Sequence, residues 1–139
     1  METKKPVITV EVSVNAPIEK TWQYFTEPAH ITVWNHASED WHCPHAENDP
    51  RTGGKFSSRM EARDGSMGFD FAGTYDEVIP MQKIAYTIGD RKVVVTFETK
   101  DGTTHVREDF EAESENPTEM QRSGWQSILN NFKKHTESN

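Results

Sequence analysis

The chain has 139 residues, a formal net charge of −8 at pH 7 and 33% hydrophobic residues, and this length suits one domain over residues 1–139 with a single core. The acidic charge argues against nucleic acid as a partner, because binding to the phosphate backbone is driven by clustered Lys and Arg. The single cysteine, Cys43, excludes an internal disulfide. Residues 1–6 lack the apolar run of a signal peptide, and no stretch is apolar and long enough to span a membrane, so the sequence predicts a soluble cytoplasmic protein.

The first predicted elements are a strand and two short helices. Apolar residues alternate with polar ones over residues 8–14, which is the period of a strand with one buried face. Pro17 suits a first helical turn, and apolar residues follow it at helical spacing until Pro28 interrupts the pattern. A second short helical piece is expected over residues 31–34. The polar residues 36–54, rich in His, Asp, Asn and Pro, are predicted to form a long irregular loop.

An antiparallel meander is predicted to follow this loop. Its strands, recognised by their alternating patterns, cover residues 56–62, 67–78, 84–88, 93–97 and 104–112, and turns are expected at Asp64-Gly65, Gly89-Asp90 and Asp101-Gly102. Gly73, in the second of these strands, is expected to bend the strand or to admit a close neighbour. In the last strand, Glu108 has the same parity as the apolar residues around it.

A long amphipathic helix is predicted over residues 116–135, with Asn116 as its cap and Pro117 at its first position. Its apolar stripe consists of Met120, Gly124, Trp125, Ile128, Leu129 and Phe132. Gln121 falls near the middle of this stripe, so one polar side chain is predicted to point into the core. Gly124 costs roughly 1 kcal/mol relative to alanine inside a helix, so it requires a packing or space-making reason.

The order of these elements favours an α+β fold in which a curved antiparallel sheet wraps around the last helix, with two short helices between the first and second strands. The meander has one face to cover, and the last helix is the long amphipathic element available to cover it. Ligand sites favour the gaps between such layers. A cavity is therefore expected between the concave face of the sheet and the C-terminal helix.

Several short motifs, spread in order over nearly the whole chain, are similar to those of a known family. They are Ala16-Pro17 with Trp22, Trp34, residues 49–56 (DPRTGGKF), residues 73–78 (GTYDEV) with Pro80, residues 84–87 (IAYT) and residues 121–125 (QRSGW). With these motifs the chain resembles the START-related helix-grip superfamily (SRPBCC) and, within it, the family of homologues of the activator of the heat-shock-protein-90 ATPase. The resemblance implies a helix-grip fold with an inner cavity that binds small apolar or amphipathic molecules in many relatives.

The resemblance implies no single chemistry, because the superfamily includes lipid carriers, plant hormone receptors, allergens and polyketide cyclases. We expect a protein that binds a small hydrophobic or amphipathic ligand, lipid- or polyketide-like, rather than an enzyme, and that needs no cofactor. The family suggests an alternative, a module that binds a chaperone through its outer surface. A third interpretation is a cyclase-like enzyme in which Glu108, beside Tyr86 and Gln121, acts as general acid or base, but no catalytic motif supports it.

The residues predicted to line the cavity combine apolar side chains with two polar groups. Glu108 and Gln121 would supply the few polar contacts of a mostly apolar pocket, because a buried polar group without a partner is costly. The alternative is that Gln121 is solvated and that Glu108 pairs with a basic neighbour; for the apolar residues the alternative is plain core packing. The full predicted set is Trp34, Phe56, Met60, Phe71, Tyr86, Phe97, Glu108, Gln121, Trp125 and Leu129.

A rival site is the histidine-rich stretch between residues 36 and 45. Its side chains are of the kinds that bind zinc or copper, namely His36, Glu39, Asp40, His42, Cys43 and His45. Their spacing fits no common metal-binding motif. We therefore assign no metal site to this stretch and expect a solvated loop.

Overall fold

The computed structural model describes residues 5–139; residues 1–4, part of the segment considered above for a signal peptide, lie outside the described residues. Within the described part of the chain, seven antiparallel strands form one sheet in the order β1-β7-β6-β5-β4-β3-β2. The elements in chain order are β1 (Val7–Val14), α1 (Ile18–Thr26), α2 (Pro28–Trp34), β2 (Trp41–Asn48), β3 (Lys55–Ala62), β4 (Gly68–Ile79), β5 (Lys83–Ile88), β6 (Arg91–Lys100), β7 (Thr103–Glu111) and α3 (Thr118–Ser138).

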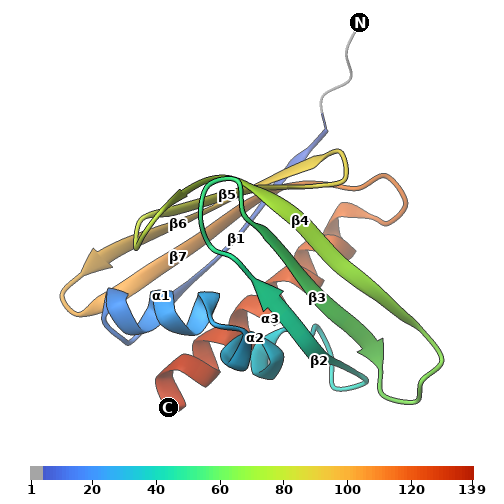
Figure 1. Cartoon of the computed structure of the whole chain (residues 1–139), viewed down its shortest axis with the longest axis horizontal. Coiled ribbons are helices and arrows are strands. Elements are labelled where there is room, and N and C mark those ends of the chain that lie inside the picture. The colour runs from blue at the N-terminus through green and yellow to red at the C-terminus, as the bar shows by residue number, and fades with distance from the viewer. Residues whose placement is uncertain (1–4) are drawn as a thin grey trace, which may run out of the picture.

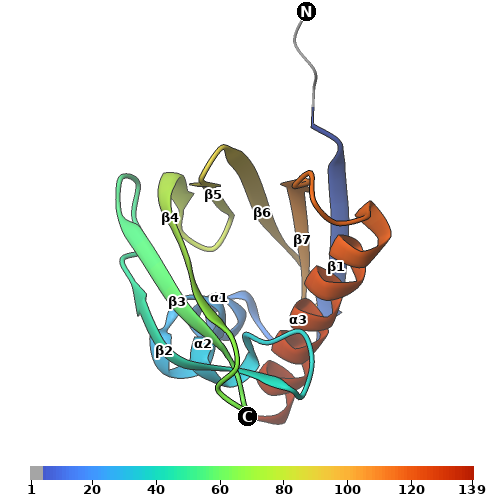
Figure 2. The same cartoon turned by 90° about the vertical axis from the view of Figure 1, so that its right-hand side faces the viewer.

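The sheet curves around α3, and the two short helices lie at one end of the curve (Figure 1). Figure 2 shows the strands as an arc from β2 to β1, with α3 packed beside β1 and with α2 beside β2. This architecture confirms the predicted α+β helix-grip fold, including the two short helices after the first strand. None of the helices in residues 5–139 is long and apolar enough to cross a membrane.

The inner face of the sheet is formed by alternate residues, as the sequence pattern predicts. In β7 the buried residues are Thr104, Val106, Glu108 and Phe110. The strand register places Glu108 opposite Val10 of β1 on one side and Val95 of β6 on the other. The predicted turns at Gly65 and Gly102 are also present, with φ of +78° and +79°, a conformation that glycine adopts at low cost. The alternation therefore carries a carboxyl group to the inner side of the sheet.

The prediction of an irregular loop over residues 36–54 is wrong for its central part, which forms the edge strand β2. Cys43 and Ala46 of this strand are buried in the core. They are three residues apart because the pairing with β3 has an irregularity at residues 42–45. Such a bulge breaks the two-residue period by which a strand is recognised in a sequence. Pro44 further disguises the strand, although an edge strand tolerates a residue without an N–H group.

The start of the last helix also differs from the prediction. α3 begins at Thr118, and Pro117 is its N-cap residue without a side-chain cap, so Asn116 does not cap the helix. Instead, the carboxylate of Glu113 accepts hydrogen bonds from the backbone and side-chain N–H groups of Asn116, at 2.9 and 2.6 Å. Met120, assigned to the apolar stripe, is 61% exposed. The buried face of α3 therefore begins after Met120.

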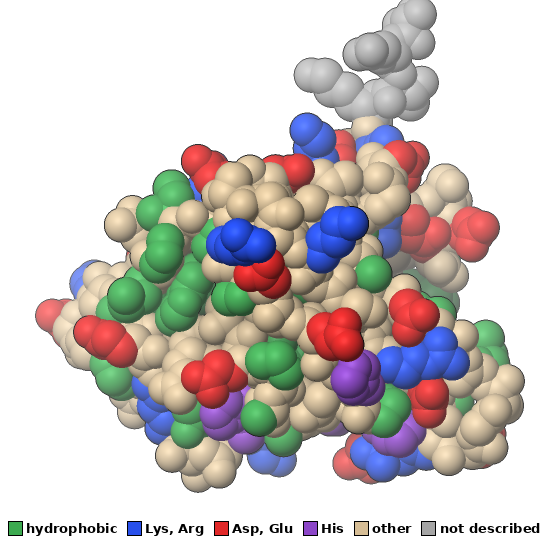
Figure 3. All heavy atoms as spheres, in the orientation of Figure 1, with side chains coloured by type: hydrophobic (Ala, Val, Ile, Leu, Met, Phe, Trp, Pro, Cys, Tyr) green, Lys and Arg blue, Asp and Glu red, His purple; other side chains and the backbone are tan. Residues whose placement is uncertain are grey.

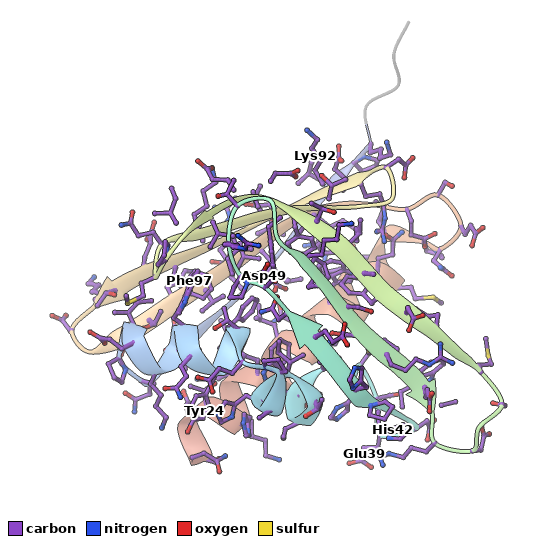
Figure 4. All side chains as sticks on the ribbon, viewed as in Figure 1. Tyr24, Glu39, His42, Asp49, Lys92 and Phe97 are labelled. Atoms are coloured by element: carbon purple, nitrogen blue, oxygen red, sulfur yellow. The ribbon has the colours of Figure 1, made fainter. Side chains whose placement is uncertain are left out.

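One end of the interior is filled by aromatic side chains under α1 and α2. Phe97 of β6 packs edge-on against Trp22 and Phe25 of α1, with ring centroids 5.2 and 5.4 Å apart; Figure 4 shows Phe97 beside this helix. Phe132 of α3 makes the same kind of contact with Phe25 and with Trp34 of α2, both at 5.2 Å. Edge-on ring pairs are favourable beyond their area burial. We call these five residues the aromatic cluster.

Candidate functional site

A cavity of about 320 Å³ lies between the concave face of the sheet and the helices α2 and α3. The predicted residues that line it are Trp34, Phe56, Met60, Phe71, Tyr86, Glu108 and Trp125. The lining residues that the sequence did not identify are Phe25, Ile31, Asn35, Glu47, Asn48, Ser58, Phe69, Tyr75, Ile84, Arg91 and Ile128. Several of these share strand parity with a predicted residue, so the two-residue period would have found them. Asn48 was missed because the whole of β2 was missed.

Three predicted residues do not line this cavity: Phe97, Gln121 and Leu129. Phe97 belongs to the aromatic cluster, and Leu129 is fully buried in the core on α3. Both are apolar residues on inward-facing positions, and the sequence pattern does not distinguish the filled end of the interior from the hollow end. Phe97 and Leu129 are thus packed in the core, which is the alternative to ligand contact given above for the apolar residues of the predicted site.

Gln121 is buried as predicted, with 8% of its surface exposed, but its amide serves the protein's own backbone. Its Oε1 accepts a hydrogen bond from the N–H of Glu113 at 2.9 Å. Its Nε2 donates to the carbonyl oxygens of Glu113 and Asn116 at 3.0 and 2.8 Å. These three bonds satisfy the amide and hold the connection between β7 and α3 against the first turn of the helix. The burial of Gln121 therefore needs no ligand to compensate it.

The rings around the cavity contact one another. Phe56 lies 5.2 Å from Tyr75, 5.0 Å from Tyr86 and 5.9 Å from Phe71, measured between ring centroids. Phe71 in turn meets Trp125 of α3 edge-on at 6.2 Å. We call these five residues the aromatic wall; it runs across β3, β4 and β5 and reaches the helix. A wall of touching rings is a preformed apolar surface for a ligand.

Gly73 gives the aromatic wall its shape. A Cβ atom at this position would lie 2.5 Å from the carbonyl oxygen of Thr87 and 2.9 Å from the ring of Phe56. Real Cβ atoms do not approach other atoms so closely, so only glycine lets the Phe56 ring lie across β4. The glycine singled out in the sequence thus admits a close neighbour, which is one of the two roles expected for it.

Glu108 is the buried carboxyl group of the cavity, with 8% of its surface exposed. No hydrogen bond or ion pair to its carboxyl occurs among residues 5–139, and burial raises its pKa to about 8. Within the described residues, every fully enclosed polar side-chain atom has a partner, so the carboxyl oxygens of Glu108 border the open space of the cavity. At neutral pH the group is mainly protonated, and it can both donate and accept a hydrogen bond.

Two further polar side chains of the cavity lining are those of Tyr86 and Arg91. The pKa of the Tyr86 hydroxyl is raised well above its usual value by burial and by the nearby Glu108. Arg91, the first residue of β6, donates from Nη1 to the carbonyl oxygen of Glu111 at 3.2 Å. The phenol therefore remains protonated at physiological pH, and the guanidinium is held by the backbone of β7.

A hydrogen-bond chain fixes the edge of the cavity. The hydroxyl of Tyr75 donates to Oδ1 of Asn48, and Nδ2 of Asn48 donates to the carbonyl oxygen of Thr26 at 2.6 Å. On the neighbouring helix, Nε1 of Trp34 donates to the carbonyl oxygen of Tyr24 at 2.9 Å. These bonds tie β4 and the edge strand β2 to α1, and they tie α2 to α1. The polar atoms of this edge are thus used for structure, unlike the carboxyl of Glu108.

The histidine-rich stretch does not gather its donors at one point. Cys43 is buried and donates to the carbonyl oxygen of His45 at 3.4 Å, and burial raises the pKa of its thiol. His42 faces Glu61 at 3.9 Å, and Figure 4 shows it near the outer edge of the sheet, in the region of Glu39. Across residues 5–139, no group of three or more His, Cys, Asp or Glu side chains is arranged to hold a metal ion. The strand β2 sends neighbouring side chains to opposite faces and so separates them.

A second hollow, of about 450 Å³, lies at the surface of β3 and β4 and is lined by Glu47, Lys55, Phe56, Ser57, Ala72, Gly73 and Thr74. It contains no buried charged group. Figure 3 shows acidic, basic and histidine side chains interspersed on the visible face, without a concentration of Lys and Arg among the side chains drawn there. The inner cavity, which contains Glu108 and the aromatic wall, is therefore the candidate site.

Comparisons with known proteins agree with this architecture. The family model described as "Activator of Hsp90 ATPase homolog 1-like protein" matches residues 15–137. The chain is similar to an AHSA1-like protein from Aeromonas hydrophila, with 38% identity, a TM-score of 0.89 and coverage of 96% of this chain and 93% of that one. It is also similar to a protein from Cytophaga hutchinsonii, with 55% identity, a TM-score of 0.82 and coverage of 95% and 92%.

A more distant structure, from Chromobacterium violaceum, shares the fold at 24% identity, with a TM-score of 0.85 and coverage of 96% of this chain and 99% of that one. Among curated proteins no match was found.

Proposed function

Since the chain belongs to the Activator of Hsp90 ATPase homolog 1-like family, we propose that it binds a small hydrophobic or amphipathic molecule in the cavity between its curved sheet and α3. The observation that carries this proposal is the carboxyl of Glu108, which borders an apolar cavity of about 320 Å³ and has no hydrogen-bond or ion-pair partner among residues 5–139. Small-molecule sites have this composition, a mostly apolar wall with a few placed polar groups.

The energetics support a binding role. Protein interiors are normally close-packed, and a hollow forfeits the dispersion contacts of its lining. A buried carboxyl without a partner adds a desolvation cost. The neighbouring aromatic cluster shows that the same fold fills its interior where it has the side chains to do so. A ligand that occupies the cavity would recover both the packing contacts and a partner for Glu108.

The cavity volume limits the ligand size. A water molecule occupies roughly 30 Å³ of liquid, so 320 Å³ corresponds to about ten water molecules. A ligand held entirely inside would then have on the order of ten non-hydrogen atoms. A longer lipid- or polyketide-like molecule would leave through the open side, where Phe69 of the lining is half exposed.

The proposal is tested with a neutral probe of this size, 4-phenyl-1-butanol, in a chemical-shift titration. We expect the shifts to concentrate on the aromatic wall and Glu108. Ser58 is buried and lines the cavity, whereas Ser57 of the same strand faces outward, so Ser58→Phe should abolish the shifts and Ser57→Phe should preserve them. Shifts that survive in folded Ser58→Phe, or that scatter over the surface, would contradict binding in the cavity.

A second candidate function, binding to a chaperone of the Hsp90 type, is favoured by the family's description alone. It predicts that a purified chaperone perturbs exposed residues and that Ser58→Phe leaves this interaction unchanged. The two functions therefore respond in opposite ways to a filled cavity. A titration of both variants with the chaperone and with the alcohol separates them.

A further inference from the structure

The cavity contains one buried ionisable acid that the fold does not use. Glu108 lies opposite Val10 and Val95, two apolar residues, on adjacent strands. Its carboxyl has neither a hydrogen bond nor an ion pair within residues 5–139. Its burial exceeds nine-tenths of its surface, and it is part of the cavity lining. A ligand group that complements this carboxyl could bind it from the cavity.

Aromatic residues lie on one side of this carboxyl. Phe110 is the next inward residue of β7 after Glu108, and Tyr86 lies in the same row as Phe110, two strands away, so both rings are on the same side of Glu108. Of these two rings, that of Tyr86 lines the cavity. The ring of Trp125 lies flat on Phe110, with centroids 3.9 Å apart and planes 9° apart. A cation placed over aromatic faces is stabilised by the ring quadrupole, and aromatic cages with a nearby carboxylate suit ammonium groups.

The positive charge of the lining is located elsewhere. Arg91 is the first residue of β6 and is bonded to the carbonyl oxygen of Glu111, whereas Glu108 lies opposite Val95, four residues further along β6. No ion pair joins Arg91 to Glu108 among the described residues, and Glu47, also in the lining, is half or more exposed and paired with His45. The carboxyl of Glu108 is therefore the ionisable group that a ligand would meet at the inner wall.

Ligands with a carboxylate fit this site poorly. A carboxylate head group would bring a negative charge into the poorly solvated space beside Glu108, where burial already keeps the protein's own carboxyl mainly protonated at neutral pH. The formal net charge of −8 adds a long-range field that repels anions and attracts cations. Both effects favour a positively charged amphiphile over a fatty acid of the same length.

We infer that the cavity selects an amine, a molecule with a basic nitrogen on an apolar or aromatic body of about ten non-hydrogen atoms, whose ammonium group pairs with Glu108 while the aromatic wall covers its body. This inference rests on the proposed binding function and gives it a ligand class. Because Glu108 is mainly protonated in the empty cavity at neutral pH, pairing with an ammonium group releases the carboxyl proton to the buffer.

The test compares three probes that share one body, 4-phenylbutylamine, 4-phenyl-1-butanol and 4-phenylbutyrate, by isothermal titration at pH 7. We expect the amine to bind at least tenfold more tightly than the alcohol, and the butyrate to bind more weakly than both. Titrations in buffers with different ionisation enthalpies should show proton release with the amine and none with the alcohol. The affinity for the amine should rise between pH 6 and pH 8, as Glu108 ionises more easily.

The variant Glu108→Gln should lose both the preference for the amine over the alcohol and the proton release on amine binding. The matched control is Glu98→Gln, which removes the same charge at an exposed position of β6 and should behave like the parent. If the alcohol binds in the cavity and the amine shows no advantage, the inference fails and the binding function stands. If none of the three probes shifts the lining residues, both fail. An unchanged preference in Glu108→Gln would also overturn the inference.

Discussion

The two ends of the interior beneath the sheet are both lined by aromatic residues, yet one is filled and the other is hollow. At the filled end, rings from α1, α2, α3 and β6 interlock edge-on in the aromatic cluster. At the hollow end, α3 contributes Trp125, whose ring lies flat on Phe110 and leaves the space over β3 to β5 open. Phe25 and Trp34 belong to the cluster and also line the cavity, so they form the boundary between the two.

The difference shows that packing depends on which elements cover the sheet. The short helices α1 and α2 lie at one end only, as Figure 1 shows, and the side chains of three helices meet there. At the other end α3 faces the curved sheet, and α1 and α2 reach the cavity only at its boundary, through Phe25, Ile31 and Trp34. Polar groups follow the same division. Trp34 donates a hydrogen bond to the carbonyl oxygen of Tyr24, and Thr21 donates one to that of Pro17, whereas Glu108 has no partner among residues 5–139.

The largest expected effect is at the filled end. Phe132 is fully buried at the centre of the aromatic cluster, so Phe132→Ala should lower the free energy of unfolding by about 3–5 kcal/mol. Trp125→Ala, at the hollow end, should cost less, because one side of that ring faces the cavity. Urea unfolding of both variants measures the difference. Equal losses would show that the two ends are packed alike.

The next effect concerns pH and the hollow end. The pKa of Glu108 is raised from 4.5 to about 8, so the unfolded chain ionises this group at lower pH than the folded chain does. Stability is therefore lost as pH rises from about 4.5 to 8, by roughly 3 kcal/mol between pH 5 and 7.5. Glu108→Gln should remove this slope and Glu98→Gln should retain it. Urea unfolding curves at several pH values in this range measure the slope. The same dependence of stability on pH in the parent and in both variants would contradict a carboxyl of Glu108 that has no partner.

A smaller loss is expected from Gln121, which was predicted to face a ligand and instead holds the start of α3. Gln121→Leu removes three hydrogen bonds and leaves backbone groups without partners, so it should cost about 1–3 kcal/mol. Binding of 4-phenyl-1-butanol should not change. The control is Gln126→Leu on the same helix, whose bonds are solvent-accessible. If folded Gln121→Leu bound 4-phenyl-1-butanol more weakly than the parent, Gln121 would have a role in ligand binding after all.

The smallest expected effect is a gain in stability on replacing Gly124. A Cβ atom at Gly124 would have no atom within 4 Å, so Gly124→Ala should raise the free energy of unfolding by about 0.5–1 kcal/mol through helix propensity. Gly73→Ala, where the Cβ atom would collide with the carbonyl oxygen of Thr87, should instead destabilise the protein. Thermal unfolding distinguishes the two. A destabilised Gly124→Ala would mean that close packing, rather than open space, requires this glycine.

Local patterns predicted much of the fold and part of the candidate site. The alternation around Glu108 identified it as an inward carboxyl, and the same rule identified Phe56, Phe71 and Tyr86. The same rule cannot tell Phe97 from Phe71, since both are inward residues and only the positions of α1 and α2 decide which is covered. It also failed for β2, because a bulge at residues 42–45 interrupts the period.

The sequence by itself determined the order of the elements, most of the turns and the inward face of each regular strand, because these depend on residues that are close together in the chain. Only the tertiary structure decided that Gln121 bonds to the turn before α3, that Asn48 joins Tyr75 to α1, and that the carboxyl of Glu108 finds no partner in the described part of the chain. These outcomes depend on contacts between segments that meet only when the sheet has curved around the helix. The cavity belongs to this second group, since an empty space is defined by what the surrounding elements leave unfilled.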